Sequence, residues 1–182
     1  LWTVAVMLLI GLDLWLFGHG FNSASDPKLL DFKPPVVQWL QDQQDPAQPW
    51  RLTSFDAPDE KLLNANSAMP YGLEDVRGYD SIIPKSYAAY MQRIQPQGDL
   101  LYNRIAPIYT MVDGQPNYDA LDSRLLDLLG TRYVVTTHTI PNAGYELAYD
   151  QEVKVYRNKD ALPRAFVVGE AIAAAIPGAR LE

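Results

Sequence analysis

Three carboxylates crowd into one short stretch of the chain, and these are the first residues to consider for chemistry. Residues 71–81 read YGLEDVRGYDS, which places Glu74, Asp75 and Asp80 among two glycines and two tyrosines. Paired carboxylates can act as general acid and general base when their surroundings separate their pKa values, and glycoside cleavage needs two of them at a defined separation. The stretch is therefore one candidate for a glycoside-cleaving site.

The same stretch also has the composition of a braced loop, which is the interpretation we favour. Arg77 is a counter-ion beside the carboxylates, and carboxylates near glycine in loops commonly cap backbone amides. A tyrosine suits a sugar ring, a lipid-headgroup boundary or anchoring of the loop to the core. We therefore predict an acceptor- or partner-binding loop rather than a catalytic centre. Its candidate residues are Tyr71, Glu74, Asp75, Arg77, Tyr79 and Asp80.

Other patterns that carry chemistry are missing from the sequence. The chain has two histidines, His19 and His138, and no cysteine, so a multi-histidine metal site and thiolate chemistry are excluded. Gly72 and Gly78 match neither a dinucleotide-binding nor a phosphate-binding spacing. We expect no metal and no cofactor. A net charge of −7 without any Lys/Arg cluster also argues against nucleic-acid binding.

The amino-terminal residues 1–17 read LWTVAVMLLIGLDLWLF, in which only Thr3 and Asp13 are polar. This run is at the short end of what crosses a bilayer, and it predicts an apolar transmembrane helix. No Lys or Arg precedes Lys28, so we expect the chain to leave the membrane on the extracytoplasmic side. The chain starts at Leu1 rather than at Met, and we expect further residues upstream. A signal peptide and a buried core helix are the alternatives.

Short elements must position the loop. After a linker over 18–32, we expect one extracytoplasmic domain over 33–182, truncated at its C-terminus. Apolar periodicity and turn residues predict a helix from Pro35, a long loop over 56–83, a helix from Pro84, and a helix that Gly130 ends. The expected strands cover 50–55, 132–137, the hairpin 145–156, and 164–168. The fold class is α/β or α+β, with a small mixed β-sheet and flanking short helices, preceded by the apolar membrane-like helix.

Four segments in order resemble the YfhO family of bacterial polytopic membrane proteins, in their large extracytoplasmic portion. They are DLWLFGHGFN, YGLEDVRGYDS leading into PKSYAAYM, LLDLLGTRYVVT, and EVKVYRNKDALPRAFVV, and the resemblance covers nearly all of the 182 residues. It implies a membrane protein similar to lipid-carrier-dependent glycosyltransferases. In such enzymes the acidic residue implicated in catalysis lies in an early extracytoplasmic loop, which would be upstream of Leu1.

The resemblance implies an accessory role for this chain. We expect an acceptor-binding domain without its own catalytic centre, held on the extracytoplasmic side of the cell membrane. The implied partners are the membrane, the rest of its own polytopic chain, and a glycan or lipid-linked sugar. Two alternatives stay open: a secreted carbohydrate-binding module, and a glycoside-cleaving enzyme that uses the loop carboxylates.

Overall fold

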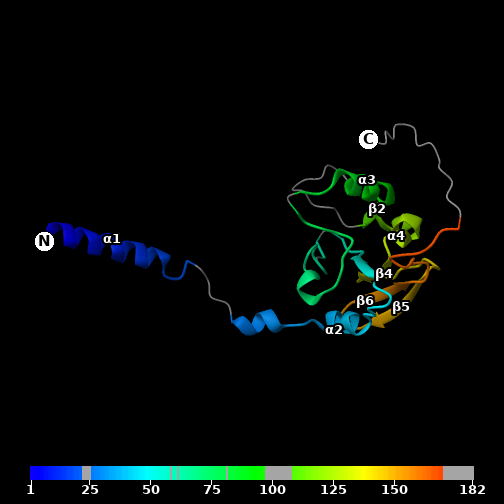
Figure 1. The fold of residues 1–182 in the computed structure, drawn as a ribbon, viewed down its shortest axis with the longest axis horizontal. Coiled ribbons are helices and arrows are strands. Elements are labelled where there is room, and N and C mark those ends of the chain that lie inside the picture. Colours follow the sequence, from blue (N-terminus) through cyan, green and yellow to red (C-terminus); the bar gives the residue numbers. More distant parts are fainter. Residues whose placement is uncertain (22–25, 58, 61, 81, 97–107, 170–182) are drawn as a thin grey trace. The chain divides into compact units, whose positions relative to one another are not determined.

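The structure is a computed structural model that describes the chain except for residues 22–25, 58, 61, 81, 97–107 and 170–182 (Figure 1). The chain divides into two units, Leu1–Pro34 and Pro35–Glu182. The second unit contains the sheet, the hydrophobic core and the 71–81 stretch. The arrangement that can position a site is therefore that of the second unit.

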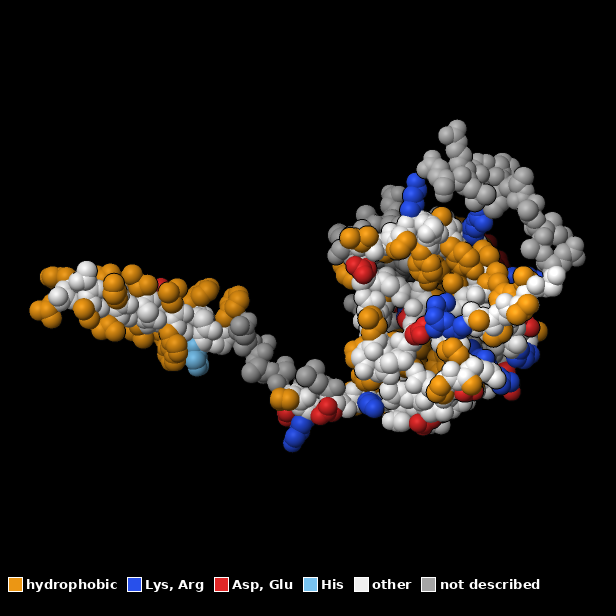
Figure 2. Space-filling view, viewed as in Figure 1, with side chains coloured by type: hydrophobic (Ala, Val, Ile, Leu, Met, Phe, Trp, Pro, Cys, Tyr) orange, Lys and Arg blue, Asp and Glu red, His pale blue; other side chains and the backbone are white. Residues whose placement is uncertain are grey.

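The first unit contains the apolar helix that the sequence predicts. Helix α1 (Trp2–Gly18) has 17 residues, all of them described, and none of them is buried. Hydrophobic side chains cover it along its length on the face that Figure 2 shows. At 1.5 Å per residue it is about 26 Å long, against roughly 30 Å for the hydrocarbon core of a bilayer. Among the described residues, no helix has both the length and the apolar character needed to cross a membrane. A short 3₁₀ helix, η1 (Pro27–Asp31), follows.

A four-stranded mixed sheet forms the centre of the second unit, as the sequence predicts. Its order is β1 (Arg51–Ser54), β4 (Thr131–Thr136), β6 (Lys154–Asn158) and β5 (Tyr145–Asp150). Strands β1 and β4 are parallel, and the other neighbours are antiparallel. The unit is therefore a mixed α+β domain.

Helices cover both faces of this sheet (Figure 1). Helices α3 (Lys85–Ile94) and α4 (Arg124–Leu128) contribute to one buried cluster, and α2 (Pro35–Asp42) contributes to the other. Because both faces are covered, β1 is buried on both sides. Thr53 and Ser54 are both fully buried.

Two predictions about secondary structure fail. The expected strand over 164–168 does not form, and the side chains of Phe166, Val167 and Val168 are exposed. The backbone just before this segment is fixed by a hydrogen bond instead, which the Leu162 amide donates to the Asp127 carbonyl. The single helix expected before Gly130 is divided at Ser123 into η4 (Asp119–Asp122) and α4, because Ser123 adopts an extended conformation.

A second, two-stranded sheet was not predicted. Strands β2 (Thr110–Val112) and β3 (Gln115–Asn117) form an antiparallel hairpin. The turn residues Asp113 and Gly114 both have positive φ, at 51° and 77°. The Asp-Gly pair is the residue pair that such two-residue turns prefer, so the signal was present in the sequence.

The 71–81 stretch is attached to the edge of the main sheet. After the 3₁₀ helix η2 (Met69–Tyr71), Asp75 forms an isolated parallel bridge with Leu52 of β1. The Leu52 amide donates to the Glu74 carbonyl at 2.8 Å, and the Val76 amide donates to the Leu52 carbonyl at 3.0 Å. These two backbone hydrogen bonds therefore fix the register of the loop against β1.

Two glycines with the same backbone conformation allow a matched stability test. Gly72 and Gly130 both have a φ of 69°, but only at Gly130 would an added Cβ meet another chain segment, the Leu162 carbonyl at 3.3 Å. A left-handed residue other than glycine costs roughly 1–2 kcal/mol. We expect Gly72→Ala to lower the free energy of unfolding by about that amount, and Gly130→Ala to lower it further, in urea titrations. Equal losses would show that Leu162 does not crowd Gly130.

Candidate functional site

Four of the six predicted site residues line one cleft. Glu74, Asp75, Arg77 and Asp80 share a cleft of about 500 Å³ with residues from β1, from η2 and from the start of α3. We call it the loop cleft, and we call residues 71–80 the motif loop. Ser81 lies outside the described residues. The motif loop thus forms one wall of a cleft. The sequence predicted a binding loop, but it did not predict the cleft.

The centre of this wall is a buried ion pair between Arg77 and Asp75. Their side chains are 2% and 4% exposed, and Arg77 Nη2 lies 2.7 Å from Asp75 Oδ2. Arg77 Nε donates to Asp75 Oδ1 at 3.1 Å, and so does the Arg77 amide at 2.8 Å. Both carboxylate oxygens of Asp75 are therefore occupied. This confirms the predicted role of Arg77 as an internal counter-ion.

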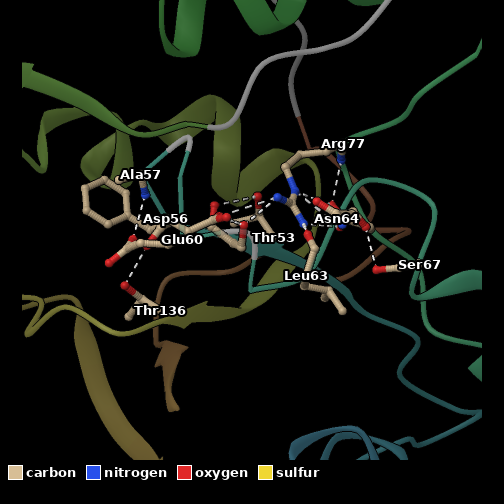
Figure 3. A network of polar contacts seen from close by, with 12 residues as sticks. Thr53, Asp56, Ala57, Glu60, Leu63, Asn64, Ser67, Arg77 and Thr136 are labelled. Carbon is tan, nitrogen blue, oxygen red and sulfur yellow. Dashed lines mark hydrogen bonds and ion pairs between the residues drawn. The ribbon is translucent and has the colours of Figure 1, made fainter. Parts of the chain in front are cut away.

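A second carboxylate, Asp56, joins the same network from the end of β1. Its Oδ1 lies 3.6 Å from Arg77 Nη1, and the Ser54 hydroxyl accepts from Arg77 and donates to Asp56. Figure 3 shows Arg77 directed toward Asp56 and toward the Leu63 carbonyl, which accepts from Nη2 at 2.5 Å. Burial raises the pKa of Asp56, and the nearby Arg77 charge opposes that rise. The network links three separate chain segments around one guanidinium.

Glu74 has different partners from its neighbour. Its Oε2 accepts from Arg164 Nη1 at 2.5 Å and from Arg51 Nε at 3.4 Å. The hydrogen bond from Arg164 is the main reason that the pKa of Glu74 is lowered. A general acid needs a raised pKa, so Glu74 is poorly suited to that role. Adjacent carboxylates thus diverge, as expected for extended chain.

The two predicted tyrosines do not line the cleft. Tyr71 is partly buried and packs against the core cluster next to α2, as anchoring predicts. Tyr79 is 53% exposed, so anchoring is wrong for its side chain. Its backbone is held instead by Asn66, whose side chain accepts from the Tyr79 amide at 3.1 Å and donates to the Tyr79 carbonyl at 2.5 Å.

A separate polar cluster lies at the carboxyl ends of β1 and β4. Glu60 accepts from the Thr137 hydroxyl at 2.7 Å and from the Ala57 amide at 2.7 Å, and its Oε2 lies 3.1 Å from His138 Nε2. Burial acts to raise the pKa of Glu60, but these three hydrogen bonds outweigh it and the pKa is lowered. The cluster fastens the loop after β1 to the end of β4.

Neither Asp75 nor Glu74 is suited to act as a general acid in the loop cleft. Asp75 has no free oxygen, and Glu74 is held as an anion by two guanidinium groups. Within the described residues, no group of three His, Cys, Asp or Glu side chains is placed to hold a metal ion.

Sequence reasoning missed four side chains that shape the cleft wall. Ser54, Asp56, Arg51 and Arg164 all contact the motif loop. Arg164 is ninety positions away from Glu74, and no local pattern indicates such a pair. Ser54 is the last residue of β1 and Asp56 lies two positions further on. Polar side chains at the carboxyl end of a strand often form sites, and this signal could have been used.

Arg77 should be the most sensitive ionic residue of the domain. Arg77→Met leaves two buried carboxylates without a cation, and breaking such a pair typically costs about 3–5 kcal/mol. We expect that loss in the free energy of unfolding at pH 7, with partial recovery on acidification as Asp56 takes up a proton. Arg157→Met is the matched control, because Arg157 pairs with Glu146 on the exposed sheet surface, and it should cost less than about 1 kcal/mol. Equal losses of unfolding free energy in Arg77→Met and Arg157→Met would show that the buried network stabilises the domain no more than an exposed ion pair does.

The Glu60 cluster should make stability depend on pH in the acidic range. Because the pKa of Glu60 is lower in the folded protein than its ordinary value of 4.5, its stabilising contribution is complete above that value. It is lost as the pH falls through the folded pKa. Thermal unfolding between pH 3 and 6 should show this loss, and Glu60→Gln should reduce it. If the unmodified protein and Glu60→Gln gave parallel profiles of stability against pH, Glu60 would make no pH-dependent contribution to stability.

Comparison with known proteins gives this chain no relative from which to take a function. Protein-family models, curated proteins and solved structures all yield no match to it. A functional proposal therefore depends on the geometry of the loop cleft, on the apolar helix α1 and on the resemblance in the sequence.

Proposed function

We propose that this chain is an extracytoplasmic accessory domain of a YfhO-like membrane protein, and that it presents an acceptor to a catalytic region elsewhere in that protein. The loop cleft is the proposed acceptor site. The domain itself supplies recognition and position, and the transfer chemistry belongs to the membrane-embedded part of the same protein.

The observation that carries this proposal is the fixed wall of the loop cleft. A braced loop can keep its shape with or without a ligand, and preformed clefts of 300–1,000 Å³ are typical of ligand sites. The buried Arg77 network and the bridge to Leu52 brace this loop from behind. The exposed residues of the cleft can then contact a ligand without ordering the backbone.

Helix α1 supports the proposed attachment to a membrane. Its described residues expose apolar side chains throughout, with Asp13 as the single charged residue. A helix that is apolar all round belongs in a hydrophobic environment. We infer that α1 attaches this chain to the membrane. The absence of Lys and Arg before Lys28 supports an extracytoplasmic exit.

Two variant pairs test the proposal, and the first tests attachment. The 182-residue chain should float with lipid vesicles in a density gradient. Leu8→Asp combined with Leu12→Asp should abolish flotation, since each aspartate at the centre of a span costs roughly 2.5–3.5 kcal/mol. Leu147→Asp, at an exposed position of β5, should float like the unmodified chain. A chain that stays in the aqueous fraction rules out the membrane attachment.

The second pair tests the role of the cleft in cells that produce the whole membrane protein. Gly78 lines the loop cleft, and an added Cβ there meets nothing within 4 Å, so Gly78→Trp should fill the cleft without a backbone clash. We expect at least tenfold less glycan on the envelope acceptor, measured by mass spectrometry. Gly169→Trp, also in open space, is the control. Full glycosylation with Gly78→Trp would disprove the acceptor site.

A further inference from the structure

The hydrogen-bonding groups of the loop cleft fall into two sets, and one set has no capacity left for a ligand. Asp75 uses both oxygens for Arg77. Arg77 donates to Asp75, to Ser54 and to the Leu63 carbonyl. The Tyr87 hydroxyl donates to the Val76 carbonyl. These side chains form the wall of the cleft, and they are not the groups that a ligand would meet.

The other set is open to a ligand and contains two carboxylates, Glu74 and Asp80, beside the partly exposed guanidinium of Arg51. Among the described residues, Glu74 Oε1 has no hydrogen-bond partner, since both arginines bind Oε2. Asp80 is exposed at the cleft, and its Oδ1 accepts only a long bond, 3.4 Å, from the Ile82 amide within the described chain. An ionised carboxylate accepts hydrogen bonds and donates none. A ligand that contacts these two carboxylates must therefore bring donors, which hydroxyl and ammonium groups both supply.

The charges around Glu74 favour neutral hydroxyl groups over ammonium. Arg51 and Arg164 both pair with Glu74, and their two positive charges balance the negative charges of Glu74 and of Asp80 at the same cleft. A cation that approached Glu74 Oε1 would meet both guanidinium groups. A neutral hydroxyl has no such penalty, and it can donate to a carboxylate in a charge-assisted hydrogen bond.

Apolar groups at the same cleft complete the pattern. Met69 and Ile82 line the cleft and are 68% and 83% exposed, so their side chains are open to contact. Both side chains can therefore contact the apolar part of a ligand in this cleft. A pyranose ring has this combination of hydroxyl groups at its edge and C–H groups on its faces.

We propose that the loop cleft binds a neutral pyranose ring. The hydroxyl groups donate to Glu74 Oε1 and to Asp80, and Met69 and Ile82 contact a C–H face of the ring. This assignment rests on the proposed acceptor site and names its ligand class. It also divides the motif loop into Asp75 and Arg77, which hold the wall, and Glu74 and Asp80, which contact the sugar.

The test is ligand-observed saturation-transfer NMR on the 182-residue chain in lipid nanodiscs. The probes are glucose, N-acetylglucosamine, glucosamine and inorganic phosphate, each up to 20 mM. We expect the two neutral sugars to bind, with little change when NaCl rises from 50 to 500 mM. Asp80→Ala should weaken binding at least tenfold, and Ile82→Ser at least threefold. Asp119→Ala is the matched control, because Asp119 is exposed but lies outside the loop cleft.

Each other outcome overturns the assignment. Binding of glucosamine alone, lost at high salt, would identify a cation site. Competition by phosphate would identify an anion site at Arg51 and Arg164. Failure of all the probes to bind, or unchanged sugar binding by Asp80→Ala with an intact circular dichroism spectrum, would exclude the sugar site. Flotation and envelope glycosylation are measured separately, so loss of this assignment can be distinguished from loss of the proposed function.

Discussion

The geometry of the loop cleft depends on one buried guanidinium group. Arg77 is almost fully removed from solvent, together with the carboxylates of Asp75 and Asp56. A buried charge is tolerated only when its partners satisfy it, and here every partner comes from a different place: the loop itself, the end of β1, and the Leu63 carbonyl. If any of these segments moved away, a buried charge would lose a partner. The network therefore ties the motif loop, the end of β1 and Leu63 to one another.

This arrangement separates buried from exposed carboxylates within a few positions. In extended chain, neighbouring side chains point to opposite sides, so Asp75 can be buried while Glu74 is half exposed. The bridge between Asp75 and Leu52 keeps this alternation in register with the sheet. Substitutions on the exposed side can then alter recognition with little effect on folding. The proposed sugar contacts all involve exposed residues.

Local sequence signals predicted the local structure well. Prolines and apolar spacing indicated α2 and α3, and β-branched residues after Gly130 indicated β4. The same signals failed at 164–168, because a β-forming composition makes a strand only where a partner strand is in reach. In the site, the Arg77–Asp75 pair was predictable from its two-residue spacing. The contacts of Arg164 with Glu74 and of Arg77 with Asp56 depend on the tertiary fold, and a single sequence contains no record of them.

The bridge of the motif loop to β1 also affects how this protein avoids aggregation. An open sheet edge offers unpaired backbone groups to other chains. At β1 the loop occupies both backbone groups of Leu52, whereas the opposite edge strand, β5, has the exposed charges of Glu146 and Asp150. One edge is thus protected by charge, and the other by the same loop that lines the loop cleft. Substitutions that loosened this loop to admit a larger ligand would also expose the edge of β1. The need to stay soluble therefore limits which substitutions the loop cleft can accept.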